Sequence, residues 1–170
     1  MKMYSVMIVD DDRTSLAISK ALLEPNYNII LMKSGVQALG YLKNNPAPEL
    51  ILLDFSMPAT SGTDVLKALQ SDEKFKDIPV IFLTSNSDDK LKIVDGLLSG
   101  AVDSIDKPVN PALLKQKVNA QIAVLQNSRE NQSMRKRIAE LENLIRQCTF
   151  LLQGAVAPSV PPTTFGSGEQ

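Results

Sequence analysis

The sequence predicts a doubly wound α/β fold, in which five parallel strands form a sheet with helices on both faces and an extended helix follows at the C-terminal end. Five short apolar runs alternate with segments in which apolar residues recur at helical spacing. The runs are apolar throughout rather than at every second position, which is typical of strands buried on both faces. Parallel strands need crossover connections, and the helical segments between the runs supply them.

The expected elements follow one another in a regular order along the chain. Strands are expected at residues 4–9, 28–32, 50–53, 80–83 and 101–105. Helices are expected at residues 13–23, 35–43, 62–70 and 88–98, and from Pro111 onward. Pro46 follows the second helix, Pro79 precedes the fourth strand, and Gly100 closes the fourth helix. Pro111 suits a first helical turn, because its missing N–H needs no partner there.

In the first of these helices, Leu16, Ala17 and Ala21, with Ile18 beside them, recur at helical spacing and are expected to face the sheet. Asp12 directly precedes this helix and is expected to be its N-cap. The three consecutive aspartates after the first strand are therefore not expected to share one role.

The helical pattern continues well beyond the length that a compact domain needs. Apolar residues recur at alternating steps of four and three, which is a heptad seam, at Met134, Ile138, Leu141, Ile145, Cys148 and Leu152. Traced backward, the same phase meets Asn131, Asn127, Val124, Ala120 and Leu113. Two interpretations are open: a dimeric coiled coil, or one amphipathic helix folded back on the domain. The expected division is a domain at 1–125, a long helix at 126–153 and a flexible, Pro-rich linker or tail at 154–170.

Composition excludes several classes of function. Lys and Arg total 18 against 19 Asp and Glu, so bulk charge gives no argument for nucleic acid or for an anionic membrane. The basic run at Arg129 and residues 135–137 is interpreted as a solvated helix face. No segment approaches the roughly 18 apolar residues of a membrane span, and no secretory signal is seen, so a cytoplasmic location is expected. The chain has no histidine, which excludes a His phosphodonor, a His-based triad and a His-liganded metal within it.

Polar residues with chemical potential follow four of the strands. Asp10 and Asp11 come after the first strand, Asp54 after the third, Thr84 after the fourth and Lys107 after the fifth. The carboxyl ends of parallel strands meet at one edge of a sheet, so these side chains are expected to converge. Converging carboxylates repel one another and call for a cation, and hard oxygen ligands suit Mg²⁺.

The expected ligands of Mg²⁺ are Asp11 and Asp54, with Asp10 acting directly or through water and the backbone carbonyl of Ser56 adding another oxygen. Phosphoryl transfer onto a carboxylate needs alignment and neutralisation of charge more than covalent chemistry. Mg²⁺, the Lys107 ammonium and the Thr84 hydroxyl would supply that neutralisation.

Residues 4 to about 125 resemble the receiver domain of two-component response regulators. The matching motifs are Met7-Ile8-Val9-Asp10-Asp11-Asp12, Ile51-Leu52-Leu53-Asp54-Phe55-Ser56-Met57-Pro58 with Gly62, Val80-Ile81-Phe82-Leu83-Thr84-Ser85, and Gly100-Ala101-Val102-Asp103-Ser104-Ile105-Asp106-Lys107-Pro108. The resemblance implies a flavodoxin-like sheet in the order 2-1-3-4-5.

By the same resemblance, Asp54 accepts a phosphoryl group from a sensor histidine kinase or a phosphotransfer protein. Asp10 and Asp11 form the acidic metal pocket, Thr84 is the switch hydroxyl, and Lys107 pairs with the phosphoryl group. The Lys107–Pro108 bond is expected to be cis. No enzymatic turnover beyond autocatalytic phosphorylation and slow dephosphorylation is implied. Asn86 is expected to tune the rate of dephosphorylation.

One position departs from the family pattern. The family has an aromatic residue three places before the lysine, whereas this chain has Ser104. A serine cannot fill the space that the aromatic ring occupies when the switch threonine moves. The hypothesis is that phosphorylation is read out through the fifth helix and its extension.

Other interpretations remain. Asp10 to Thr14 fit the Asp-x-Asp-x-Thr motif of haloacid-dehalogenase-type phosphatases, in which the first Asp, here Asp10, is the nucleophile and the third, here Asp12, is the acid/base. That family gives no role to Asp54. A degenerate receiver that serves only as a protein-binding scaffold is the other alternative. The long helix resembles the signalling helix that joins receivers to cyclic-di-nucleotide cyclase or phosphodiesterase domains, so signalling through a homodimer to an output module outside this chain is expected.

Overall fold

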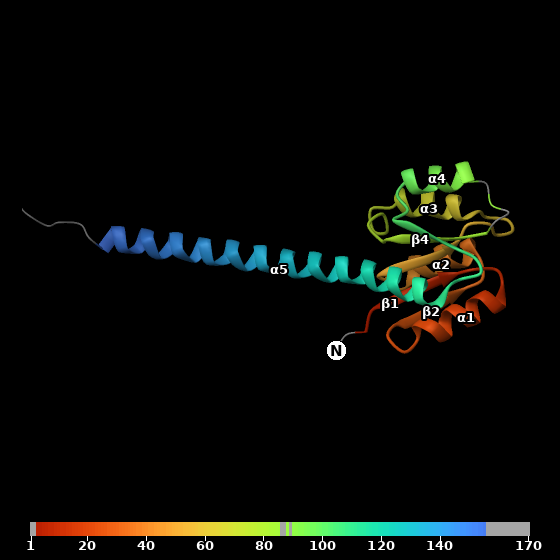
Figure 1. Ribbon diagram of the computed structural model, residues 1–170. Coiled ribbons are helices and arrows are strands. Elements are labelled where there is room, and N and C mark those ends of the chain that lie inside the picture. The colour runs from red at the N-terminus through yellow and green to blue at the C-terminus, as the bar shows by residue number, and fades with distance from the viewer. Residues whose placement is uncertain (1–2, 86–87, 89, 156–170) are drawn as a thin grey trace, which may run out of the picture. The chain divides into compact units, whose positions relative to one another are not determined.

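The computed structural model describes residues 3–85, 88 and 90–155 of the 170-residue chain (Figure 1). The chain divides into two units, Met1–Gln126 and Asn127–Gln170. Within the described residues, no helix is long and apolar enough to cross a membrane.

Five strands and five helices alternate in the described chain. The strands are β1 (Ser5–Val9), β2 (Asn28–Met32), β3 (Leu50–Asp54), β4 (Val80–Thr84) and β5 (Asp103–Asp106). The helices are α1 (Arg13–Leu23), α2 (Gly35–Asn44), α3 (Gly62–Gln70), α4 (Lys90–Leu98) and α5 (Pro111–Ala155). All strand pairs are parallel and the order is β2-β1-β3-β4-β5, which confirms the predicted fold.

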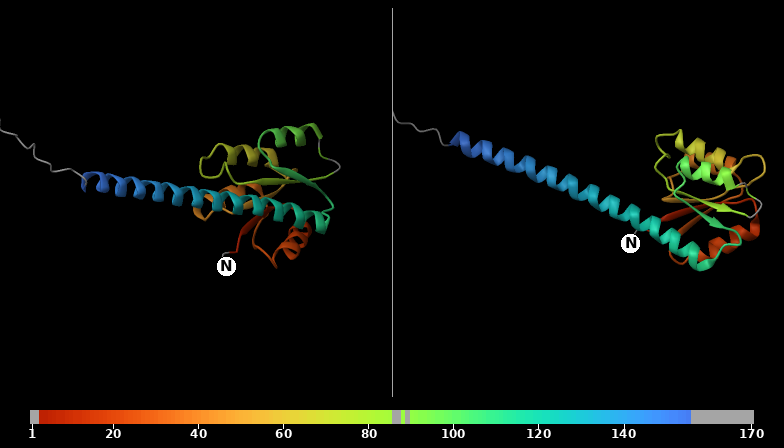
Figure 2. Two further views of the ribbon diagram at one scale, coloured as in Figure 1. Left: turned by 60° about the vertical axis from the view of Figure 1, so that its left-hand side comes forward. Right: turned by 45° about the horizontal axis from the view of Figure 1, so that its top comes forward.

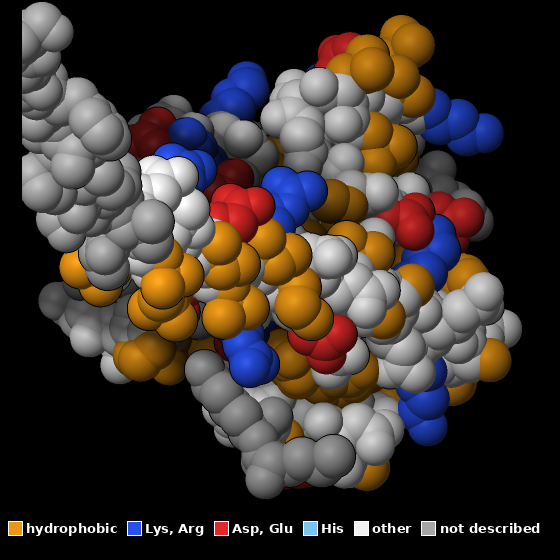
Figure 3. All heavy atoms as spheres, turned by 90° about the vertical axis from the view of Figure 1, so that its left-hand side faces the viewer, with side chains coloured by type: hydrophobic (Ala, Val, Ile, Leu, Met, Phe, Trp, Pro, Cys, Tyr) orange, Lys and Arg blue, Asp and Glu red, His pale blue; other side chains and the backbone are white. Residues whose placement is uncertain are grey.

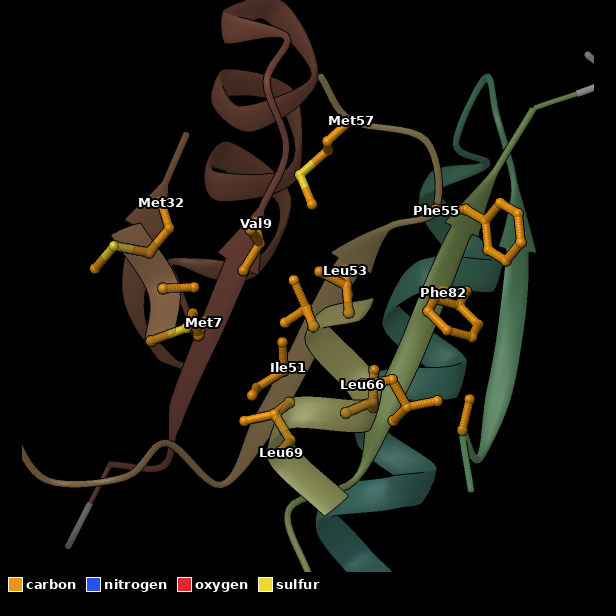
Figure 4. Close-up of a cluster of buried hydrophobic side chains, with 14 of the residues drawn as sticks. Met7, Val9, Met32, Ile51, Leu53, Phe55, Met57, Leu66, Leu69 and Phe82 are labelled. Atoms are coloured by element: carbon orange, nitrogen blue, oxygen red, sulfur yellow. The ribbon is translucent and has the colours of Figure 1, made fainter. Parts of the chain in front are cut away.

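One face of the sheet is covered by α2, α3 and α4 (Figures 1 and 2). Figure 4 shows the middle of this layer, where side chains from β1, β3 and β4 meet those of α3. The rings of Phe55 and Phe82 lie edge to face with centroids 5.2 Å apart. A Cβ added to Gly96 would lie 2.6 Å from Phe82 Cε2, so α4 needs a glycine to approach β4 this closely.

The other face of the sheet is covered by α1 and the first part of α5. Leu114, Val118 and Ile122 of α5 are buried against it, together with Leu16 and Leu23 of α1. The start of α5 is fixed by a hydrogen bond of 3.1 Å from the Leu113 N–H to the side chain of Asn110. The domain thus ends on a helix whose apolar face is used up by the sheet.

The prediction for the inward face of α1 is confirmed for Leu16 and wrong for the other three residues. Ala17, Ala21 and Ile18 are exposed, and Leu16, Ser19 and Leu23 are the buried positions. Ser19 is buried although its small polar side chain gives no apolar signal, so the apolar pattern alone misplaces the inward face of this helix.

Two other elements begin two residues later than expected. The helix expected from Asp88 begins at Lys90, because the Asp88 side chain binds neighbouring loops instead, as described below. The last strand is Asp103–Asp106 rather than 101–105, so Asp106 belongs to the sheet. This shift has consequences for Thr84.

Candidate functional site

Three carboxylates gather at the carboxyl end of β1 and β3. Asp10 follows β1 and is fully buried, Asp54 is the last residue of β3 and is only 5% exposed, and Asp11 is exposed. One oxygen from each of the three lies within 4.8 Å of the others. The Asp12 N–H donates a 2.9 Å hydrogen bond to Asp10 Oδ1, which orients that carboxylate. The predicted convergence of these aspartates is therefore present in the fold.

Lys107 brings a positive charge to this cluster from the other side of the sheet edge. Its Nζ atom lies 2.8 Å from Asp10 Oδ2 and 3.1 Å from Asp54 Oδ2. Its backbone N–H donates to the Thr84 carbonyl at 2.6 Å, and the following bond to Pro108 is cis, as predicted. The ammonium thus bridges the buried aspartate and the aspartate of the strand end.

The charges of the cluster do not balance. With all groups ionised, three carboxylates and one ammonium leave two net negative charges. Burial and the nearby charge of Asp10 raise the pKa of Asp54 from 3.8 to about 6, against the opposing effect of Lys107. Burial alone would lower the pKa of Lys107, but its contacts with Asp10 and the charges of Asp54 and Asp10 raise it. The site therefore lacks positive charge.

A divalent cation fits this donor set. Oδ2 of Asp10 is buried and receives no hydrogen bond from the described residues; the ionic contact with Lys107 is its close partner. Two added positive charges would neutralise the cluster, and three carboxylates are the hard ligands that Mg²⁺ takes. Asp10, Asp11 and Asp54 are the residues that would hold it. The contribution of the Ser56 carbonyl stays a prediction.

Thr84 is buried at the end of β4, and its hydroxyl donates a 2.9 Å hydrogen bond to Asp106 Oδ1. The two residues are paired across β4 and β5. The sequence interpretation missed Asp106 because it ended the last strand one residue too early. This pairing could have been predicted by extending the last strand to Asp106, because that residue then lies opposite Thr84.

The position that departs from the family pattern is tied directly to α5. Lys117 Nζ donates to the Ser104 carbonyl at 2.7 Å and to Asp103 Oδ1 at 2.6 Å. Both contacts lie within the first unit of the chain. Lys117 therefore links β5 to α5 beside Ser104.

Asp12 is the N-cap of α1, as predicted. Its side chain accepts hydrogen bonds from the N–H groups of Thr14 and Ser15, both at 3.1 Å, and from the Ser15 hydroxyl at 2.9 Å. These bonds lower its pKa. A carboxylate held in this way is poorly suited to the acid/base role that the phosphatase interpretation requires.

Asp88 connects two loops at the edge of the site, a role that was not predicted from the sequence. It accepts a 2.6 Å hydrogen bond from the Ser56 hydroxyl and a 2.5 Å bond from the Ser85 N–H. Asn86, predicted to tune dephosphorylation, lies outside the described residues.

Gly62 allows the loop after β3 to close tightly. A Cβ at this position would lie 2.6 Å from the Asp54 carbonyl oxygen and 3.0 Å from Phe55 Cα. Both are backbone atoms, so they cannot move aside without moving Asp54. The glycine in the recognised motif thus has a direct steric reason.

Sequence and structure comparisons identify the family of this domain. The family described as "Response regulator receiver domain" matches residues 6–119. Chemotaxis protein CheY1 of Helicobacter pylori is 33% identical over 115 residues, which are 66% of this chain and 92% of that protein. A crystal structure of the signal receiver domain of a signal transduction histidine kinase from Syntrophus aciditrophicus is 30% identical, with a TM-score of 0.64, and the match covers 71% of this chain and 90% of that one.

A longer relative also matches the extension. The protein named "Probable cyclic di-GMP phosphodiesterase" of Vibrio cholerae is 32% identical over an alignment of 167 residues that covers 94% of this chain. This chain spans 37% of that relative's length.

The fold and the cluster of aspartates with a lysine define a domain of two-component signalling systems. The chain belongs to the response regulator receiver domain family.

Proposed function

We propose that this protein accepts a phosphoryl group on Asp54, with the help of Mg²⁺, from a sensor histidine kinase or a phosphotransfer protein. The observation that carries the proposal is the position of Asp54 Oδ2, 3.1 Å from the Lys107 ammonium within the cluster that includes Asp10 and Asp11. Among the described residues, Asp10 and Asp54 are the two buried carboxylates at a strand end that contact this ammonium. Asp10 lies deeper and is fully buried, which leaves Asp54 as the acceptor.

The residues would act together as follows. An Asp54 carboxylate oxygen forms a bond to phosphorus while the bond between phosphorus and the donor breaks. Lys107 stays within reach of the transferred group and balances its charge. A bound Mg²⁺ would neutralise the equatorial oxygens and hold Asp54 in its ionised form. At pH 7 most of Asp54 is already ionised, since its pKa is about 6.

Thr84 is proposed to respond to the new group. Its hydroxyl donates to the Asp106 carboxylate in the unphosphorylated protein, and a phosphoryl group on Asp54 would add ionised oxygens as competing acceptors. Reaching that oxygen means leaving Asp106, which is a neighbour of Lys107 in the chain. The change of hydrogen-bond partner would therefore alter the end of β5, where Asp106 lies.

We propose that β5 passes this change to α5 through Lys117. The contacts of Lys117 with Asp103 and the Ser104 carbonyl support this, because they join β5 to α5 at the position where the family has an aromatic residue. The helix would then transmit the signal to an output module through a homodimer. The match of 94% of this chain, α5 included, to a protein named for cyclic di-GMP phosphodiesterase activity makes such a module a reasonable target.

Phosphorylation can be tested with acetyl phosphate and Mg²⁺. The wild-type protein is expected to become labelled and Asp54→Asn to remain unlabelled. Asp77→Asn, at an exposed carboxylate away from the site, is the matched control and should label like the wild type. If Asp54→Asn still takes the label while Asp10→Asn does not, the phosphatase interpretation replaces this one.

The signalling step needs a separate test. Beryllofluoride, a mimic of the phosphoryl group, is expected to change both the dimer affinity and the mobility of α5. Lys117→Met should abolish that response while leaving labelling of Asp54 intact. An unchanged dimer affinity and helix mobility with beryllofluoride would contradict the proposed route.

A further inference from the structure

The second unit of the chain consists, in its described part, of the C-terminal portion of α5, whose heptad seam is exposed. Positions a are Asn131, Ile138, Ile145 and Leu152, and positions d are Asn127, Met134, Leu141 and Cys148. Ile138 is 48% exposed, and the other apolar seam residues are more exposed or equally open. Figure 3 presents a face of the molecule on which exposed hydrophobic side chains lie beside charged ones.

The seam residues favour a coiled coil of two helices. β-Branched residues at a with leucine at d are typical of parallel dimers, and this is the arrangement of Ile138, Leu141 and Ile145. An asparagine at a, here Asn131, fixes the register of such a dimer, because it pairs with its own copy across the seam. In other registers this amide faces an apolar side chain.

The charges beside the seam are complementary for one arrangement. In a parallel dimer, a residue at g faces the residue five places later, at e, on the other helix. Glu130 would then face Arg135 of the second copy, and Arg137 would face Glu142 of the second copy. Both pairs are attractive, and symmetry makes each occur twice. The next pair in the series, Leu144 with Thr149, is uncharged.

An antiparallel pair fits less well, because g then faces g and e faces e. The antiparallel register that brings Arg135 to Glu142 of the other helix puts Asn131 opposite Cys148 and leaves Arg137 beside Leu144. It loses half of the charge pairs and buries the amide without a partner. Register and charge therefore select the same orientation.

We propose that residues 127–152 of two copies of this chain form a parallel, in-register, two-stranded coiled coil. This coiled coil specifies the homodimer of the proposed function. Only its role in signalling rests on that proposed function. Both chains enter the coiled coil from the same end. Cys148 of one copy then lies across the seam from Cys148 of the other.

A charge exchange tests the orientation in the full chain. Arg137→Glu places Glu opposite Glu142 twice, so the dimer dissociation constant measured by sedimentation is expected to rise by about tenfold or more. Glu142→Arg should do the same, and an equimolar mixture of the two variants should recover wild-type affinity. Lys136→Glu makes the same charge change at a position pointing away from the seam and is the matched control. If Arg137→Glu behaves like Lys136→Glu, the parallel pairing is refuted.

The single cysteine gives an independent readout. Diamide, which takes up two hydrogens as two thiols form a disulfide, is expected to convert the protein into a covalent dimer through Cys148. Cys148→Ser combined with Leu141→Cys, at d, should also crosslink. Cys148→Ser combined with Asn143→Cys, on the outer face, should not. A dimer in solution that does not crosslink through Cys148 overturns the register.

Labelling of Asp54 by acetyl phosphate is measured on the same samples. A protein that takes the label but sediments as a monomer or a tetramer refutes the coiled coil and leaves the phosphoacceptor role intact. A parallel dimer that takes no label supports the coiled coil and refutes that role. A monomer would favour the helix folded back on the domain.

Discussion

Replacing Asp54 with asparagine is expected to stabilise the protein above pH 6 in the absence of metal. The physical reason is the raised pKa of Asp54, which is about 6 in the folded protein against 3.8 for an ordinary aspartate. The folded state binds this proton more tightly than the unfolded state. Stability contributed by the protonated group is therefore present at low pH and is lost as pH rises from about 4 to 6.

The size of the effect follows from that shift. A difference of about two units corresponds to about 3 kcal/mol, at 1.36 kcal/mol per unit, as an upper limit. Asparagine keeps the shape but removes one partner of Lys107, which keeps its contact with Asp10. The expected net gain for Asp54→Asn is therefore about 1–2 kcal/mol at pH 7.5.

Urea unfolding with EDTA, at several pH values between 4 and 7.5, measures this gain. The curves of wild type and Asp54→Asn should converge near pH 4 and separate above pH 6. Asp77→Asn, at the exposed control site, should follow the wild type throughout. Adding Mg²⁺ should stabilise the wild type more than the variant, because binding to the folded state raises its stability. A variant less stable than wild type at pH 7.5, or a difference that does not change with pH, would show that the pKa of Asp54 is not raised in the folded protein.

Three further substitutions, one of them with a matched control, probe other parts of the first unit. Gly62→Ala should lower the free energy of unfolding by about 2 kcal/mol and slow labelling of Asp54, because its Cβ would meet a backbone atom at 2.6 Å. Gly40→Ala is the control, because a Cβ there meets nothing within 4 Å. It should raise the free energy of unfolding in urea by about 0.5–1 kcal/mol. Lys107→Met should cost about 3 kcal/mol in EDTA at pH 7, because it leaves a buried carboxylate without a cation, and Mg²⁺ should return part of the loss; an unchanged midpoint would contradict the charge imbalance. Ala59→Asn should raise the thermal midpoint by the equivalent of about 0.5–1 kcal/mol, since φ at this position is 66°, a conformation that asparagine tolerates better than alanine; a lower midpoint would count against it.

The sequence was informative wherever chemistry depends on topology. Strand ends in a parallel sheet share one edge, so the meeting of Asp10, Asp54 and Lys107 could be predicted from the sequence alone. The same holds for the Asp12 cap, because a short acceptor side chain before a helix has few other uses. The order of the strands came from the family resemblance.

The contacts of Asp88, Asp106 and Lys117 could not be predicted in the same way. They depend on which loops meet and where a strand stops, and a shift of one residue in the last strand hid the pairing of Asp106 with Thr84. The buried face of α1 was missed for a related reason, because the small Ser19 packs inward without an apolar signal.

The most direct test of the central claim is to locate the phosphoryl group. The protein is incubated with acetyl phosphate and Mg²⁺, treated with borohydride to reduce the acyl phosphate, and fragmented for mass spectrometry. We expect the modification at Asp54 alone, and we expect it to disappear when EDTA replaces Mg²⁺. Modification at Asp10, or undiminished modification at Asp54 in EDTA, would contradict it.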